Sequence, residues 1–190
     1  MLMKALNRFY YPTKYTSRSQ VLALGVKCIF IYYQQKDKSS AVKVAEYLQG
    51  IGLDIYFNQY DAELCIQHQA KKPRKVTELI CKGINNSSHM LVIVSPNTIN
   101  SSWVPFEIGY GFEKADLSVL CLKGMPKGSL PEYMRTAAII RDICDFNIKV
   151  SNILGKPQSL LEQTKQMSSY SSPANSLYEA MVPIISDPYN

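Results

Sequence analysis

The residues best suited to chemistry lie in one short segment, residues 95–107, with the sequence SPNTINSSWVPFE. The segment holds the only tryptophan of the chain, Trp103, and an acid four residues later, Glu107. Because residues i and i+4 share a face of a helix, a helix that begins near Ser101 or Ser102 places the carboxylate one turn from the indole. On composition alone, a core tryptophan beside a surface acid is the simpler interpretation.

Short apolar runs separated by stretches of helical spacing predict the elements that position this segment. Strands are expected at 26–33, 53–57, 90–95 and 117–122, with a short fifth around 137–143. Helices are expected around 41–48, 76–84 and 104–112, the last with Val104, Phe106, Ile108 and Phe112 as its apolar residues. This alternation predicts an α/β fold, a parallel sheet with helices on both faces.

Ligands of such sheets bind at the carboxyl ends of the strands. In this chain those ends hold residues 32–37, 58–61, 95–100 and 123–128. The candidate substrate-binding residues come from three of these ends and from the helix start that follows: they are Tyr32, Tyr33, Gln34, Asn58, Ser95 and Trp103.

The chain divides into a domain over residues 26–150, an N-terminal arm over 1–25 and a helical or irregular extension over 151–190. The net charge is +6, from 21 basic and 15 acidic residues, but Lys4, Arg8, Lys14 and Arg18 supply +4 of it in an arm without acids. The remaining +2 argues against a nucleic-acid binder. We expect the arm to be solvated, or to form a short helix on the domain.

Other classes of site have little support. The sequence has no run of about 18 uncharged apolar residues, so no membrane-spanning helix is expected. It also has no apolar segment after Met1 of the kind found in a secretory signal, so a cytoplasmic protein is expected. Five scattered cysteines and two distant histidines, His68 and His89, predict neither disulfides nor a metal site, and the histidines are interpreted as loop or surface residues. Gly109 and Gly111 form a GxG within a helical pattern, which favours close helix packing over a phosphate loop.

Taken in order, the segments resemble a bacterial TIR (Toll/interleukin-1 receptor) domain over about residues 26–145. Residues 29–33 resemble its first-strand box, followed by the matching acid Asp37, and residues 55–58 resemble the strand that leads into its BB loop. Residues 91–96 resemble its third strand, and the segment ending at Glu107 matches its Ser-x-Trp-x-x-x-Glu pattern. Tyr32 stands where the box usually has serine, and Asn58 where an acid is common.

The resemblance implies a flavodoxin-like parallel sheet flanked by helices (the TIR fold) and cleavage of NAD+ at its nicotinamide–ribose bond, with Glu107 as the catalytic residue. Tyr33 and Trp103 would stack on the nicotinamide or adenine. NAD+ is then the substrate, and no cofactor or metal is expected. A chain of this kind is similar to the TIR component of Thoeris-type antiphage defence, which implies a nucleotide signal for a separate effector protein. It also implies self-association, with the loop at residues 58–73 reaching a neighbouring pocket.

The chemistry of NAD+ fits a single carboxylate. Nicotinamide leaves as a neutral molecule from a cationic precursor, so no general acid is needed, unlike in ordinary glycosidases. Three alternatives stay open: a TIR domain used only for interaction, another small α/β enzyme acting on nucleosides, such as a deoxyribosyltransferase-like protein, and a flavodoxin-like electron carrier.

Overall fold

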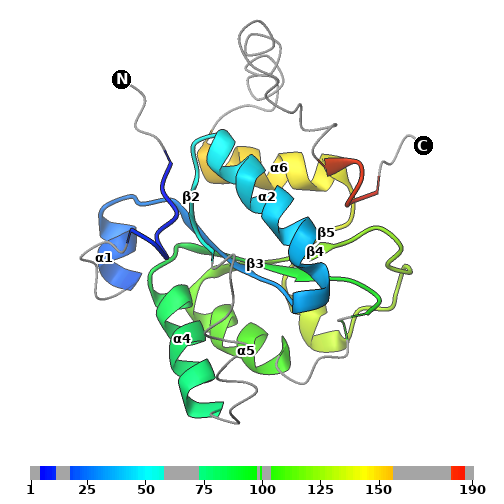
Figure 1. The fold of residues 1–190 in the computed structure, drawn as a ribbon, viewed down its shortest axis with the longest axis horizontal. Helices are drawn as coiled ribbons and strands as arrows, with labels where there is room; N and C mark the ends of the chain where they lie inside the picture. Colours follow the sequence, from blue (N-terminus) through cyan, green and yellow to red (C-terminus); the bar gives the residue numbers. More distant parts are fainter. Residues whose placement is uncertain are drawn as a thin grey trace, which may run out of the picture.

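A computed structural model describes residues 5–11, 18–57, 73–97, 99, 104–155 and 181–186. Its centre is a parallel sheet of five strands in the order β2-β1-β3-β4-β5 (Figure 1). The parallel α/β fold is confirmed, and this strand order is the flavodoxin-like one. The strands are β1 (Cys28–Tyr32), β2 (Asp54–Tyr56), β3 (His89–Val94), β4 (Asp116–Cys121) and β5 (Ala138–Ile140).

Helices cover both faces of the sheet. In Figure 1, α2 and α6 lie on one face, and α4 and α5 lie on the other. A short helix, α1, precedes β1, and two 3-10 turns, η1 and η2, lie before α2 and before β5. The bounds are α1 (Arg18–Ala23), η1 (Gln35–Asp37), α2 (Lys38–Gly50), α4 (Pro73–Asn85), α5 (Val104–Lys114), η2 (Glu132–Thr136) and α6 (Ile143–Leu154).

The strands are apolar on both faces because both faces are covered. In β1, Ile29 and Ile31 belong to the core beneath α2 and α6. The alternate residues Cys28, Phe30 and Tyr32 belong to the core beneath α4 and α5. All five positions of β1 are buried, which explains why its sequence is a continuous apolar run.

Two glycines let the helices of one face approach the sheet closely. A Cβ added at Gly83 of α4 would lie 2.4 Å from Cε2 of Phe30, and one added at Gly111 of α5 would lie 2.3 Å from Sδ of Met90. The interpretation of the GxG as a packing feature is therefore confirmed at Gly111. It is wrong for Gly109, where an added Cβ would meet open space.

Helix α6 is an element that the sequence patterns did not indicate, since the fifth strand was expected to continue to residue 143. The strand ends at Ile140, and Asp142 begins the helix by accepting a hydrogen bond from the Asp145 backbone N–H at 2.9 Å. The helix ends at Leu154 and is followed by Gly155, whose φ of 67° is the left-handed conformation that glycine adopts easily.

The segment at residues 181–186 completes the core beneath α2 and α6. Met181, Ile184 and Ile185 are buried there. The backbone N–H of Lys123, just after β4, donates to the carbonyl of Ile184 at 2.8 Å. Residues far apart in the sequence thus close the same face of the sheet.

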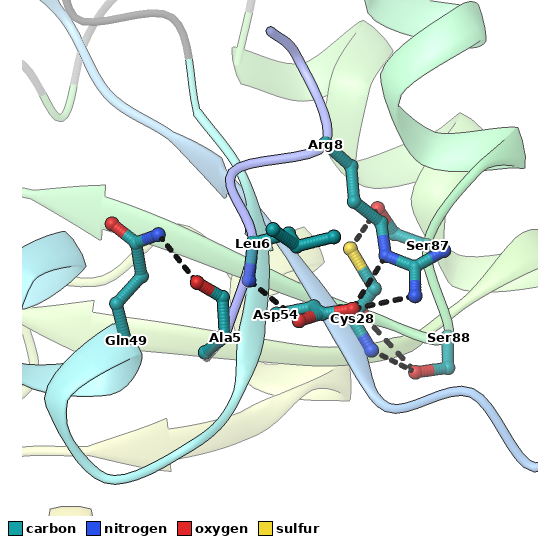
Figure 2. Close-up of polar contacts among 8 residues, drawn as sticks. All are labelled: Ala5, Leu6, Arg8, Cys28, Gln49, Asp54, Ser87 and Ser88. Atoms are coloured by element: carbon teal, nitrogen blue, oxygen red, sulfur yellow. Dashed lines mark hydrogen bonds and ion pairs between the residues drawn. The ribbon is translucent and has the colours of Figure 1, made fainter. Parts of the chain in front are cut away.

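The described part of the N-terminal arm is not a solvated basic segment, so that expectation is wrong for Arg8. Residues 6–8 pair with β2 in parallel, through Ile55 N–H to Leu6 O at 3.0 Å and Arg8 N–H to Ile55 O at 2.7 Å. The Arg8 side chain is 8% exposed, and its Nη2 lies 2.5 Å from Oδ2 of Asp54 (Figure 2). The buried Arg8 side chain is therefore paired with the carboxylate of Asp54, at the start of β2.

Polar contacts also join the beginnings of the central strands. The Ser88 hydroxyl bonds the backbone of Cys28, accepting from its N–H at 3.0 Å and donating to its carbonyl at 3.1 Å (Figure 2). His89 Nδ1 lies 2.7 Å from the Ser88 hydroxyl, and its Nε2 lies 3.7 Å from Asp116 Oδ2. Lys149 Nζ of α6 donates to Asp116 Oδ1 at 2.8 Å. The interpretation of His89 as an ordinary loop or surface residue is wrong, because it begins β3 and links two neighbours.

Buried thiols behave as core residues. Cys28 and Cys121 are buried, and the four cysteines within the described ranges are all free. Burial raises the pKa of the Cys28 thiol to about 12 and also raises the pKa of Cys121.

Across the described ranges, no helix is long and apolar enough to cross a membrane. No group of three His, Cys, Asp or Glu side chains within those ranges could hold a metal ion.

Candidate active site

The geometry of the sheet marks one place for a ligand. Strand β1 pairs with β2 on one side and with β3 on the other. The chain leaves β1 towards α2 on one face and leaves β3 towards α5 on the opposite face (Figure 1). The crevice between two such exits, at the carboxyl ends of the strands, is where ligands of open parallel sheets bind. We call this edge of the sheet the carboxyl edge, and the edge where the strands begin the amino edge.

The two tyrosines at the end of β1 lie on different faces. Tyr32 belongs to the core that contains Val104 and Ile108 of α5. Tyr33 belongs to the other core, and its ring packs against Phe57 with centroids 5.3 Å apart. The alternation of side chains along an extended chain produces this separation. Of the pair, Tyr32 is therefore the one on the α5 side.

Gln34 is brought together with Tyr32. Its Nε2 donates a hydrogen bond to the Tyr32 hydroxyl. The phenol and the amide are thus adjacent at the carboxyl edge, on the side of the sheet that leads to α5. Both residues were predicted to bind substrate, and their contact gives that edge a polar group beside an aromatic one.

Asp37 adds an acid that was noted only as a motif position and was left out of the predicted binding residues. It is 5% exposed and lies at the end of η1, immediately before α2. A carboxylate at a helix start is favoured by the partial positive charge of the helix N-terminus. The sequence did contain one signal for it, an acid shortly after the carboxyl end of a predicted strand.

Ser95 shapes the exit from β3. Its hydroxyl accepts a hydrogen bond from the Asn97 backbone N–H at 3.2 Å, and its carbonyl accepts one from Ile99 N–H at 3.0 Å. Such local bonds are typical of a turn stabilised by a serine hydroxyl. Ser95 is 5% exposed, so it contributes to the shape of the chain between β3 and α5.

Helix α5 carries the predicted catalytic acid. Its backbone begins at Val104, with Pro105 in the first turn, where proline is tolerated, and Glu107 is its fourth residue. Val104 and Ile108 are buried against the sheet and fix the helix beside the end of β3. Three of the predicted site residues lie outside the described part of the structure. They are Asn58, Trp103 and, for its side chain only, Glu107.

A void of about 10 Å³ lies elsewhere, in the core between the sheet and α6. Its lining includes His89, the first residue of β3, and Lys149. It has room for about one water molecule at most, so it is no substrate pocket. The candidate site is therefore the carboxyl edge, because the chain leaves β1 and β3 there towards opposite faces of the sheet.

The comparisons with known proteins agree with this fold. A family model described as a TIR domain matches residues 29–143, from β1 to the first residue of α6. The chain belongs to the TIR domain family. The match contains Tyr32, Asp37, Ser95 and Glu107, so the candidate site lies within the TIR domain. The resemblance to the family is thus confirmed, and so is the fold expected from it.

A solved structure shows the same fold at low identity. The TIR domain is similar to a metazoan TIR-STING receptor from C. gigas in complex with 2′,3′-cGAMP, with a TM-score of 0.50 and 20% identity over 68% of this chain and 39% of that chain. A second structure of a metazoan TIR-STING receptor from C. gigas gives a TM-score of 0.47 and 19% identity over 68% and 40%. The chain thus spans about two fifths of these receptors. The comparison with curated proteins gave no match.

Proposed function

We propose that this TIR domain cleaves NAD+ at its nicotinamide–ribose bond, with Glu107 as the catalytic residue. The observation that carries the proposal is the position of Glu107 in the first turn of α5. That turn follows β3 at the place where the strand order reverses. A carboxylate in the first turn is also stabilised in its charged form by the helix dipole.

The reaction breaks the C–N bond between ribose and nicotinamide. The bonding electrons go to the nicotinamide ring, which leaves as a neutral molecule, and the positive charge passes to the ribose. A fixed carboxylate stabilises this oxocarbenium-like state or holds the ribose hydroxyls. Water then adds to the ribose carbon and loses a proton, giving ADP-ribose. Attack by the substrate's own adenine gives a cyclic isomer instead, and another nucleophile gives a conjugate.

The residues around the carboxyl edge have supporting roles in this proposal. Tyr32 and Gln34, already in contact, would bind the nucleotide on the α5 side. Tyr33, Asn58, Ser95 and Trp103 complete the predicted binding residues, with the two aromatic rings offering stacking surfaces. NAD+ is the substrate, and the reaction requires no metal or further cofactor.

The wider role proposed is signalling in bacterial antiphage defence, in the cytoplasm. The product would activate a separate effector protein, as in Thoeris-type systems. TIR domains would associate with one another through their surfaces, and the segment at residues 58–73 would reach a neighbouring site. Activity per molecule should then rise with protein concentration or with a crowding agent, whereas a self-sufficient monomer would show constant specific activity.

Nicotinamide release by purified protein tests the proposal, with and without a crowding agent or lysate from phage-infected cells. Glu107→Gln should lower the rate by about 10³-fold or more, as expected when a group that stabilises charge in the transition state is removed. Glu113→Gln is the matched control, because Glu113 is an exposed acid on the same helix. Turnover that is equal in the two variants, or absent from wild type under every condition, would reject the proposal.

A TIR domain used only for interaction is the second candidate, and one observation favours it. Phe106 and Phe112 were expected on the apolar face of α5, but they are 40% and 57% exposed. Phe106 stacks on Tyr110 with ring centroids 6.4 Å apart, so an aromatic surface lies on the outside of this helix. Exposed aromatic residues are enriched at protein interfaces. Retention of wild-type self-association by Glu107→Gln, with no turnover in wild type, would support this alternative.

A further inference from the structure

The N-terminal segment adds a short parallel strand to the outer edge of β2. Asn7 forms a parallel bridge with Ile55. Backbone hydrogen bonds flank the bridge, from Ile55 N–H to Leu6 O and from Arg8 N–H to Ile55 O. The ladder then stops, because the chain turns at Asn7, whose carbonyl accepts from the N–H groups of residues 10 and 11.

The side chain of Asn7 supplies the next rung of this ladder. Its Nδ2 donates to the carbonyl of Phe57 at 2.7 Å, and its Oδ1 accepts from the N–H of Phe57 at 3.1 Å. The same Oδ1 accepts from the N–H of Phe9 at 3.1 Å, which turns the chain away. One primary amide therefore holds both backbone polar groups of Phe57, as a neighbouring strand would.

Phe57 connects this amide to the carboxyl edge. It follows β2 directly and is 3% exposed. Its ring packs against Tyr33 with centroids 5.3 Å apart and an interplanar angle of 43°. A continuous path of contacts thus runs from Asn7 through Phe57 to one of the predicted substrate-binding tyrosines.

The other end of the same segment is fixed separately. Arg8 reaches Asp54 at the start of β2, and Leu6 N–H donates to Asp54 Oδ1 at 2.8 Å (Figure 2). Asn7 is therefore held in place by the neighbouring residues of its own segment. Its amide needs no rearrangement to support Phe57, which is what a positioning group requires.

We propose that Asn7 is a positioning residue that fixes Phe57 and, through it, Tyr33 in the arrangement that binds NAD+. The functional half of this inference rests on the proposed cleavage of NAD+. Asn7 acts through Phe57 and Tyr33, so its loss affects substrate binding more than the chemical step. The expected signature is a higher KM for NAD+ with a nearly unchanged kcat.

Hydrogen exchange and the Tyr33 ring signals in Asn7→Ala test the contact without any turnover. The Phe57 amide should exchange about tenfold faster than in wild type, since it loses its acceptor, and the Tyr33 ring resonances should shift. The amide of Val92, in the centre of the sheet, should exchange as before. Unchanged Phe57 and Tyr33 signals, or equally faster exchange at Val92, would overturn the proposal.

Two further variants separate the amide from the segment as a whole. Asn7→Asp keeps the acceptor for Phe57 N–H but loses the donor to the Phe57 carbonyl, so exchange there should be faster than in wild type and slower than in Asn7→Ala. Gln49→Ala removes only the bond from Gln49 Nε2 to Ala5 O, 3.4 Å long, and should leave Phe57 and Tyr33 unchanged. If Gln49→Ala has the same effect as Asn7→Ala, the segment and not Asn7 is responsible, and the proposal is overturned.

Kinetics then test the link to function. Asn7→Ala should raise KM for NAD+ by about three- to tenfold and keep kcat within about twofold of wild type. A fall in kcat at constant KM would contradict the positioning role. If wild type releases no nicotinamide, the proposed cleavage fails, whereas the exchange measurements still decide whether Asn7 positions Phe57 and Tyr33.

Discussion

The two edges of the sheet use polar residues differently. At the amino edge, polar side chains pair with one another or with the backbone, as in Arg8 with Asp54 and Ser88 with Cys28. At the carboxyl edge, the described polar groups bond to residues close by in the sequence, as in Gln34 with Tyr32 and Ser95 with the Asn97 backbone. The amino edge therefore joins distant parts of the chain, whereas the contacts at the carboxyl edge, where parallel α/β sheets bind their ligands, are local.

The largest effect on stability is expected at the Arg8–Asp54 pair. Arg8→Met keeps an apolar side chain of similar length but leaves the Asp54 carboxylate, 19% exposed, without its cation. Breaking a mostly buried pair should lower the free energy of unfolding by about 3 kcal/mol, measured by urea denaturation. Nicotinamide release at saturating NAD+, at a temperature where the variant is folded, should stay near the wild-type rate.

Matched changes sharpen this prediction. Lys149→Met breaks a pair in which Asp116 is 54% exposed, and it should cost less than about 1 kcal/mol. Adding Asp54→Asn to Arg8→Met removes the uncompensated charge and should recover part of the lost stability. Equal losses for Arg8→Met and Lys149→Met would contradict the view that Arg8 closes a buried site.

A smaller effect is expected from helix packing beneath the sheet. In Gly83→Ala the new methyl group would meet the Phe30 ring, which is buried within β1 and has little freedom to move. The expected loss of unfolding free energy is about 1–3 kcal/mol. Gly111→Ala meets the flexible end of Met90 and should lose less, since a thioether can rotate away. The reverse order in thermal melts would show that α5, and not α4, lies under tighter constraint.

The last effect appears only at alkaline pH. Burial raises the pKa of Cys28 to about 12 in the folded protein, above the ordinary thiol value of 9.0. Between these values the unfolded chain loses the proton and the folded protein keeps it, so stability falls as pH rises above about 9. Cys28→Ala should flatten this decline in urea denaturation, and Cys144→Ala should leave it unchanged. A decline of equal slope in both variants would exclude Cys28 as its source.

The sequence predicted the central strands well because buried parallel strands are continuous apolar runs, as in residues 28–32 and 90–94. The sequence did not predict features that depend on contacts between distant parts of the chain. Arg8 lies in a segment with no acid, and its partner Asp54 is 46 residues away. Helix α6 was missed because only Arg141 and the cap residue Asp142 separate the apolar residues of Ala138–Ile140 from those of the helix start.

The candidate site was predicted in part by position along the chain. Tyr32, Gln34 and Ser95 were placed at strand ends, and the structure places all three at the carboxyl edge. The separation of Tyr32 from Tyr33 follows from strand alternation, but spacing alone did not show that Phe57 occupies the Tyr33 side. Asn7 could not be found from the sequence, because its role depends on pairing with Phe57, 50 residues later.

The most direct test of the central claim is a crystal structure of Glu107→Gln bound to NAD+. The account predicts the nucleotide across the carboxyl edge, with the residue 107 side chain within about 4 Å of the anomeric carbon of the nicotinamide ribose, the distance that reaction at that carbon requires. A nucleotide bound away from the first turn of α5, or a residue 107 side chain directed to solvent, would contradict the assignment of Glu107 even though the fold is unchanged.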